Sequence, residues 1–137
     1  MAALACKEGM RVAMDAVYKT NATPENKEII LFSNNATISG ATVNADLTEI
    51  TTNGGEKKTL TKASWDASTD ADPVVSQYNS TTGVVFSFTG ALTVYGYAIR
   101  GVTSAKIYGA ENFGVQTYAN GQSLTIAPLT ISNDITP

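Results

Sequence analysis

The spacing of apolar residues changes near Pro24 and predicts one helix followed by a series of short strands. From about Leu4 to Lys19 the apolar residues recur at three- and four-residue intervals, which is typical of an amphipathic helix. The apolar stripe of this helix comprises Met10, Ala13, Met14, Val17 and Tyr18. Beyond Pro24 short apolar runs alternate with clusters of Asn, Gly, Ser and Asp, which is the pattern of strands joined by turns.

The first expected strand, residues 27–33, carries four consecutive apolar side chains, which is typical of a central strand covered on both faces. Residues 48–52 and 58–63 are expected to form a hairpin around the turn Asn53–Glu56, whose sequence Asn-Gly-Gly-Glu favours a reversal of the chain. The remaining strands are expected at residues 84–89, 92–100, 105–110 and 122–129, with turns at Gly90–Ala91 and Asn120–Gly121.

Single residues add expectations about the geometry and the position of these strands. Gly96 lies inside a strand and predicts a bulge or the close approach of another backbone. Tyr95 and Tyr97 are two residues apart, so they are expected on one face of their strand. Pro128 favours an edge position for the last strand, because it cannot donate to a ladder. Lys57–Lys58 are expected at a solvated edge, where lysines discourage stray strand pairing.

Together these patterns predict a mainly β protein. The expected fold is a single antiparallel β-sandwich or jelly-roll-like domain of seven to eight short strands with an N-terminal α-helix. A chain of 137 residues is long enough for one core and leaves little room for two. We therefore expect one structural unit in which residues 1–22 form a helical arm and residues 23–137 form the sandwich.

The amino-acid composition excludes several classes of catalytic and metal-binding site. Charged residues make up only 15% of the chain, against about 25% in ordinary soluble domains, and neutral Thr, Ser and Asn replace them. The absence of histidine excludes Ser-His-Asp and Cys-His catalysis and His-ligated metals. The single cysteine, Cys6, can form neither an intramolecular disulfide nor a cysteine-based zinc site. We expect a structural or binding protein that is not an enzyme and needs no cofactor.

The net charge of −3 lacks the basic footprint of a protein that binds nucleic acid or an anionic membrane, so neither is an expected partner. The N-terminus has no basic segment and only a five-residue apolar stretch after Met1, which is too short for a secretory signal. No apolar run approaches the ~20 residues that cross a bilayer. We expect the chain to be made in a cytoplasm and to stay soluble.

Two further features have competing interpretations. Residues 66–72 place oxygen ligands at alternating positions, but an EF-hand would need Gly and Glu where this chain has Ala71 and Gln77. A solvated acidic loop and an irregular, weak calcium site are the interpretations that remain. Six aromatic residues suit either a sugar-stacking platform or core packing: Trp65, Tyr78, Tyr95, Tyr97, Tyr108 and Tyr118.

Five short motifs occur along nearly the whole chain in a fixed order. They are Lys-Glu-Gly at residues 7–9, Leu-Phe-Ser-Asn-Asn at 31–35, Val-Tyr-Gly-Tyr at 94–97, Ile-Tyr-Gly-Ala-Glu-Asn-Phe at 107–113, and Asn-Gly-Gln-Ser-Leu-Thr-Ile-Ala-Pro at 120–128. In this combination the chain resembles a group of small virion structural proteins of tailed bacteriophages. Residues 38–80 carry no such match, and the resemblance transfers no catalytic residue.

The resemblance implies a capsid cement or decoration protein on the outer surface of a bacteriophage head. It implies the major capsid protein as partner and self-association as a homo-oligomer, with a trimer favoured. The expected docking residues lie on the helix and in the C-terminal tail: Met10, Met14, Val17, Tyr18 and Ile135. The helix stripe has a second interpretation, packing against the chain's own sheet. The alternative function is a phage tail, fibre or adaptor component that binds a glycan or receptor.

Overall fold

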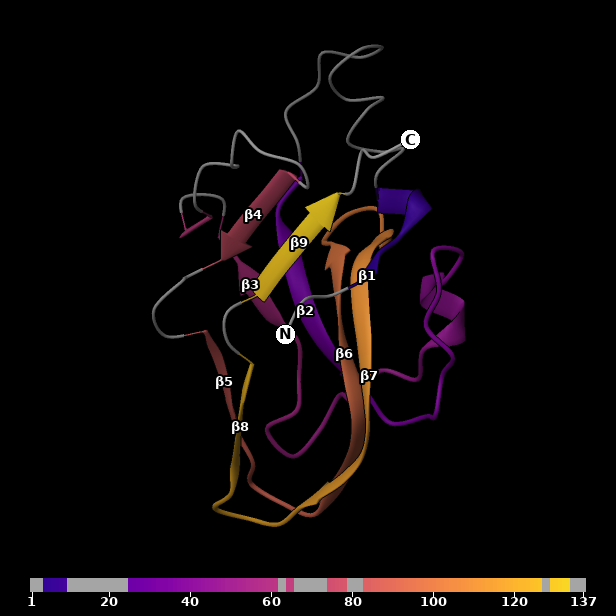
Figure 1. Cartoon of the computed structure of the whole chain (residues 1–137). Helices are drawn as coiled ribbons and strands as arrows, with labels where there is room; N and C mark the ends of the chain where they lie inside the picture. The colour runs from indigo at the N-terminus through magenta and orange to yellow at the C-terminus, as the bar shows by residue number, and fades with distance from the viewer. Residues whose placement is uncertain are drawn as a thin grey trace.

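The computed structural model describes residues 4–9, 25–61, 64–65, 74–78, 83–126 and 129–133. These residues are mainly β, with antiparallel sheets and very little helix, as the sequence predicts (Figure 1). The strands are β1 (Leu4–Ala5), β2 (Lys27–Phe32), β3 (Lys58–Leu60), β4 (Val74–Tyr78), β5 (Val84–Ser87), β6 (Leu92–Gly101), β7 (Ile107–Tyr118), β8 (Ser123–Ile126) and β9 (Leu129–Asn133). A short 3-10 helix, η2 (Asn44–Asp46), interrupts the long connection between β2 and β3.

The described strands form three antiparallel sheets. The largest has the order β1-β7-β6-β2-β3, while β4 pairs with β9 and β5 pairs with β8. In Figure 1 the β5–β8 pair lies on one side of the large sheet, and the part of the β2–β3 connection that contains η2 lies on the other. The predicted number of seven to eight strands and the sandwich packing are not confirmed by this arrangement.

Strand β2 is covered on both faces, as its continuous apolar run predicts. Ile29 and Leu31 belong to one hydrophobic core, which we call the ribbon-side core, and Ile30 and Phe32 belong to a second, the loop-side core. All four side chains are fully buried. The ribbon-side core adds residues of β3, β5, β6 and β8, and the loop-side core adds Cys6, Ala36, Leu47, Ala98, Ile107 and Ala110.

Strands β5 and β6 form a single antiparallel ribbon with β7 and β8. Val84 pairs with Ile126 and Ser87 with Ser123, and the ladder resumes where Leu92 pairs with Tyr118. Residues 88–91 and 119–122 separate these two ladders, so each strand uses the same number of residues to pass between them. The ribbon therefore keeps its register through the bend that is seen at the bottom of Figure 1.

This bend, which we call the corner (Phe88–Ala91 and Ala119–Gln122), has its own hydrogen bonds. The Phe88 amide donates to the Gln122 carbonyl at 2.8 Å, and the Gly121 amide donates to the Phe88 carbonyl at 2.9 Å. Gly121 has φ 88°, which glycine adopts without the steric cost of a Cβ atom. The predicted turn at Asn120–Gly121 is thus confirmed, but it joins strands of two different sheets.

Gly96 confirms both readings of a glycine inside a strand. The pairing of β6 with β7 shifts register between Val94 and Gly96, and a Cβ atom on Gly96 would lie 1.9 Å from the Glu111 carbonyl oxygen. The irregularity overturns the prediction that Tyr95 and Tyr97 share a face. Tyr97 is buried in the ribbon-side core, whereas Tyr95 packs against the loop-side core, because the shift breaks the two-residue alternation.

The predicted hairpin around Asn53 is wrong in its pairing. The turn itself exists, with φ 57° at Asn53 and φ 83° at Gly54. However, β3 pairs with β2, and residues 48–52 contribute only an isolated bridge between Glu49 and Phe32. Burial of β2 between two neighbours outweighs the local hairpin signal. Strands β4 and β9 were not expected from the sequence.

The helix predicted from Leu4 to Lys19 is wrong at its first residues. Leu4 and Ala5 pair with Ala110 and Gly109 on β7, and helical backbone begins only at Lys7 and reaches Gly9. A two-residue strand satisfies the edge of β7 here, which three- and four-residue spacing cannot reveal. The remainder of the predicted helix, residues 10–19, lies outside the described residues.

Candidate functional site

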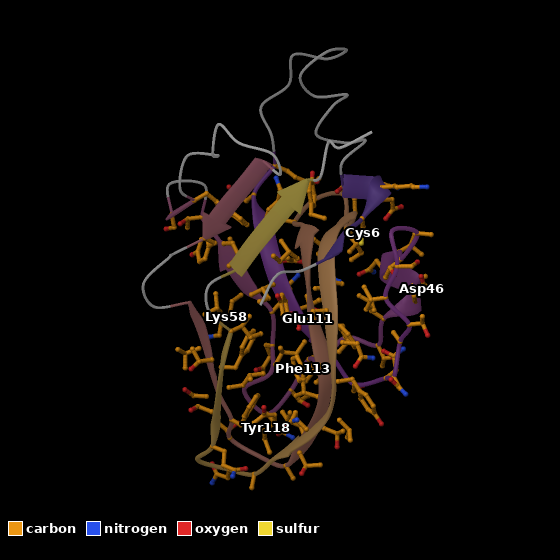
Figure 2. The ribbon with its side chains drawn as sticks, in the orientation of Figure 1. Cys6, Asp46, Lys58, Glu111, Phe113 and Tyr118 are labelled. Carbon is orange, nitrogen blue, oxygen red and sulfur yellow. The ribbon has the colours of Figure 1, made fainter. Side chains whose placement is uncertain are left out.

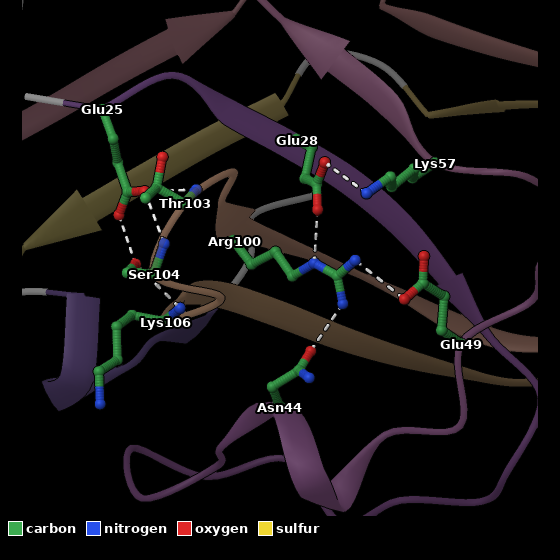
Figure 3. Close-up of polar contacts among 9 residues, drawn as sticks. All are labelled: Glu25, Glu28, Asn44, Glu49, Lys57, Arg100, Thr103, Ser104 and Lys106. Atoms are coloured by element: carbon green, nitrogen blue, oxygen red, sulfur yellow. Dashed lines mark hydrogen bonds and ion pairs between the residues drawn. The ribbon is translucent and has the colours of Figure 1, made fainter.

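A buried ion network surrounds Arg100 near the end of β6. Its Nε donates to Glu28 Oε1 at 2.7 Å, its Nη1 donates to Asn44 Oδ1 at 2.8 Å, and its Nη2 lies 2.9 Å from Glu49 Oε2 (Figure 3). The side chains of Arg100 and Glu28 are 8% and 4% exposed. Lys57 Nζ lies 3.4 Å from the second oxygen of Glu28.

The network balances its charges and uses every nitrogen of the guanidinium. Two carboxylates face two cations, so neither buried charge is left without a partner. The contacts join β6 and β2 to η2 and to the segment before the turn at Asn53, across as many as 72 positions of sequence. These contacts of Arg100 fix the long β2–β3 connection on the sheet. We therefore interpret the network as a structural feature of the fold.

A second carboxylate organises the turn between β6 and β7. Glu25 Oε2 accepts hydrogen bonds from the Thr103 and Ser104 amides at 2.8 and 2.9 Å, and Oε1 accepts one from the Ser104 hydroxyl. Burial alone would raise the pKa of Glu25, but the hydrogen bonds from Ser104 and Thr103 outweigh it and lower the pKa below its usual value. Figure 3 shows this clamp beside the Arg100 network.

The opposite end of the same ribbon carries no charge. Asp, Glu, Lys and Arg are absent from Val74 to Ile99 and from Asn112 to Asn133. We call the ribbon segments Val84–Leu92 and Gly114–Ile126 the neutral end. Its exposed side chains are Val, Ala, Ser, Thr, Asn and Gln, and Val85 and Val115 are 47% and 56% exposed.

The two edges of the large sheet differ in protection. The β3 edge carries Lys57 and Lys58, as predicted for an edge that must avoid stray pairing. On the other side, β1 pairs with β7 only at Gly109 and Ala110. Among the described residues, the rest of β7 has no strand on its outer side and bears no charge after Glu111.

The aromatic residues pack into the molecule. Trp65 and Tyr78 meet edge to face with ring centroids 5.4 Å apart, and Tyr118 lies 4.5 Å from Phe88 in the same measure. Each of the six candidates for a sugar platform is buried or partly buried against one of the two cores. Burial raises the pKa of Tyr108 to about 12, with a further contribution from the charge of Glu25.

Tyr97 and Glu111 face one another in the β6–β7 ladder. Within the described part of the chain, neither the Tyr97 hydroxyl nor Glu111 Oε2 has a hydrogen-bond partner, although both atoms are buried. Burial, followed by the negative charge of Glu111, raises the pKa of Tyr97 well above its usual value. Figure 2 shows Glu111 and Phe113 on β7 near the middle of the molecule and Tyr118 towards the corner.

The docking residues expected from the sequence lie outside the described residues: Met10, Met14, Val17, Tyr18 and Ile135. The same holds for the acidic loop at 66–72 and for Pro128. Sequence reasoning missed the Arg100 network, for which an arginine inside an apolar strand is the only local signal. It also missed the neutral end, which the uneven distribution of charged residues along the chain would have indicated.

The described residues contain no group of three or more His, Cys, Asp and Glu side chains placed to hold a metal ion, and no helix among them is long and apolar enough to span a membrane. No known protein family matches the chain, and neither a curated protein nor a solved structure is significantly similar to it.

Proposed function

We propose that this chain is a virion structural protein, a cement or decoration protein that binds the major capsid protein on the outer surface of a bacteriophage head. The neutral end is the observation that carries the proposal. Its exposed hydroxyl and amide groups can hydrogen-bond to a protein surface without burying an unpaired charge. The exposed Val85 and Val115 add apolar contact at this surface.

The architecture supports a rigid module of this kind. We propose that the sheets pack as a sandwich or jelly-roll-like domain, because the ribbon-side core joins β5 and β8 to β2, β3 and β6. The ribbon bends while keeping its register, and strands that pass between two packed sheets make their corners by bends of this kind. A homo-oligomer, with a trimer favoured, would multiply modest contacts on the shell through avidity.

Electron microscopy of the virus that encodes the chain tests the location. With the chain labelled at its C-terminus, we expect density at many equivalent positions on the outside of the head. Label found only on the tail would overturn the capsid proposal and favour the alternative of a tail, fibre or adaptor component.

Charge substitutions test the surface. Ser87→Glu and Thr125→Glu place a charge on the exposed face of the β5–β8 pair, and we expect each to weaken binding to capsids that lack the protein by at least tenfold. Thr37→Glu is the matched control, because Thr37 is also exposed but lies on the β2–β3 connection. Equal binding by all three variants would show that the neutral end is not the docking surface.

The predicted helical arm needs a separate test. Deleting residues 1–20 would also remove β1 and Cys6, which is buried in the loop-side core. Substituting Met10, Met14 and Val17 together by Ser leaves residues 4–9 intact. We expect the triple variant to fold and to lose occupancy on capsids. Full occupancy would exclude these residues as anchors.

A further inference from the structure

The ribbon can be bent or straight at the corner with the same pairing of its residues. Because residues 88–91 and 119–122 match in number, a straightened corner would join the β5–β8 ladder to the β6–β7 ladder without shifting any pair. One ladder bond, from the Phe88 amide to the Gln122 carbonyl, already continues the β5–β8 register into the corner. The Gln122 amide donates instead to the Ala119 carbonyl, and this turn would open in a straightened ribbon. Bending or straightening therefore changes only the backbone of a few residues.

The corner is held bent by a second turn, which we call the wedge (Thr52–Gly55). Asn53 Nδ2 donates to the Ala91 carbonyl at 3.1 Å, and the Thr89 amide donates to the Asn53 carbonyl at 3.0 Å. A Cβ atom on Gly54 would lie 2.1 Å from the Ser87 carbonyl oxygen. The wedge therefore packs against the corner so closely that only glycine fits at residue 54. The wedge belongs to the β2–β3 connection and not to the ribbon.

The inner face of the β5–β8 pair supplies part of the ribbon-side core. Val84, Phe86 and Ile126 are 7%, 0% and 6% exposed, and they share this core with Ile29, Leu31 and Leu60 of the large sheet. A straightened ribbon would withdraw these side chains from their own sheet. A second copy of the chain, opened in the same way, presents the identical surface that they left.

We propose that the corner is a hinge and that two copies of this chain can exchange their β5–β8 arms across it. In the exchanged pair, the arm of one copy packs on the large sheet of the other, so every core contact is remade between copies. The β4–β9 pair moves with the arm, because only residues 127 and 128 join β8 to β9, and its contacts with β1 are remade between copies as well. The contacts that are lost without replacement lie at the corner and the wedge, which makes exchange a low-cost route to association. Residues 61–73 join β3 to β4, and a chain of this length spans at most about 43 Å when extended. The connection is therefore long enough for the movement once the contact between Trp65 and Tyr78 opens.

The proposal is independent of any role in a virion, because it concerns the isolated chain. Its partner is a second copy, chosen because only the same sequence reproduces the withdrawn core contacts. The neutral character of the arm favours this encounter, since two copies that each carry a net charge of −3 exchange segments that hold no like charges.

A disulfide that can be formed and reduced between the wedge and the corner tests the hinge. A Cβ atom on Gly90 would lie 2.8 Å from Asn53 Cγ, which suits a disulfide between Asn53→Cys and Gly90→Cys. In a Cys6→Ala background only this pair can oxidise. The protein is warmed at high concentration to the temperature at which unfolding begins, and it is then cooled. The fraction of dimer is measured by size-exclusion chromatography with light scattering.

We expect the reduced protein to form dimer that dissociates slowly on dilution, because release requires the arms to leave the cores. The oxidised protein should form at least tenfold less dimer. Equal dimer in both redox states would overturn the proposal, because a dimer made through an outer surface needs no open corner. Absence of dimer from the reduced protein would overturn it as well.

A matched pair of glycine variants provides a second test that uses no cysteine. Gly121 at the corner and Gly114 on β7 have φ 88° and 84°, and a Cβ atom at either meets nothing within 4 Å. Valine at both sites carries the same conformational cost and favours extended backbone. We expect Gly121→Val to raise the dimer fraction several-fold over Gly114→Val, and equal fractions would contradict the hinge.

Discussion

The β6–β7 ribbon ends in two regions that are stabilised by opposite means. At one end Arg100, Glu28 and Glu49 form a buried charge network, and Glu25 clamps the adjoining turn. At the other end the corner and the β5–β8 arm contain no charged residue and depend on apolar burial and on the geometry of glycine turns. About 30 Å of strand separates them, given the length of β6.

The difference shows that one ribbon is stabilised by buried charges at one end and by apolar burial at the other. The charged end fixes a long connection by directional bonds, which specify one arrangement and are costly to break. The neutral end leaves its outer surface free of charge, and its bend is held by backbone hydrogen bonds, the wedge contacts and apolar burial. We therefore expect mutations at the charged end to affect stability most and mutations at the neutral end to affect association.

The largest effect on stability should come from Arg100→Met. Removal of the guanidinium leaves Glu28 buried with only the exposed Lys57 as a partner, and we expect a loss of about 3–5 kcal/mol. Chemical denaturation at pH 7 measures the loss. Lys106→Met, which removes an exposed partner of Glu8, is the control and should cost about 1 kcal/mol or less. Similar losses in both would show that the buried network is not special.

A smaller loss is expected from Gly54→Ala in the wedge. The new Cβ atom would meet the Ser87 carbonyl oxygen and would also require a left-handed backbone, which costs roughly 1–2 kcal/mol by itself. Gly114→Ala carries the backbone cost in open space. Thermal unfolding should therefore rank Gly54→Ala as the more destabilised variant. The reverse order would show that the wedge does not press on the corner.

Glu25→Gln should change the pH dependence of stability. The folded-state pKa of Glu25 is lowered, so its carboxylate stabilises the fold above the usual carboxyl pKa of about 4.3, and this contribution is lost as the pH falls through the folded-state pKa. We expect the variant to lose about 1 kcal/mol or less at pH 7 and to converge with the wild type as the pH falls below the folded-state pKa of Glu25. A difference that does not shrink at low pH would exclude a role for the charge.

The smallest change in stability is expected from Ser87→Lys on the neutral end. The side chain is exposed and makes no hydrogen bond among the described residues, so the free energy of unfolding should change by no more than about 0.5 kcal/mol. Urea denaturation checks this value. A loss above 1 kcal/mol would mean that the outer face of the arm is packed against something in the isolated chain.

Local features were predictable from the sequence where neighbouring residues set the backbone. The runs that became β2, β5 and β6 were identified, as were the turns at Asn53–Gly54 and Asn120–Gly121 and the irregularity at Gly96. Apolar spacing placed Leu4 and Ala5 in a helix, because periodicity cannot report that an edge of β7 is available to them.

The sequence by itself determined that this chain is mainly β, where several strands lie, and that it holds no histidine and one cysteine. Only the tertiary structure decided that β3 joins β2, that Tyr95 and Tyr97 face different cores, and that Arg100 meets Glu28. The physical reason is the distance along the sequence over which the deciding interactions act. Turn dihedrals and side-chain alternation depend on adjacent residues, whereas pairing and burial depend on which distant segments pack together at the lowest free energy.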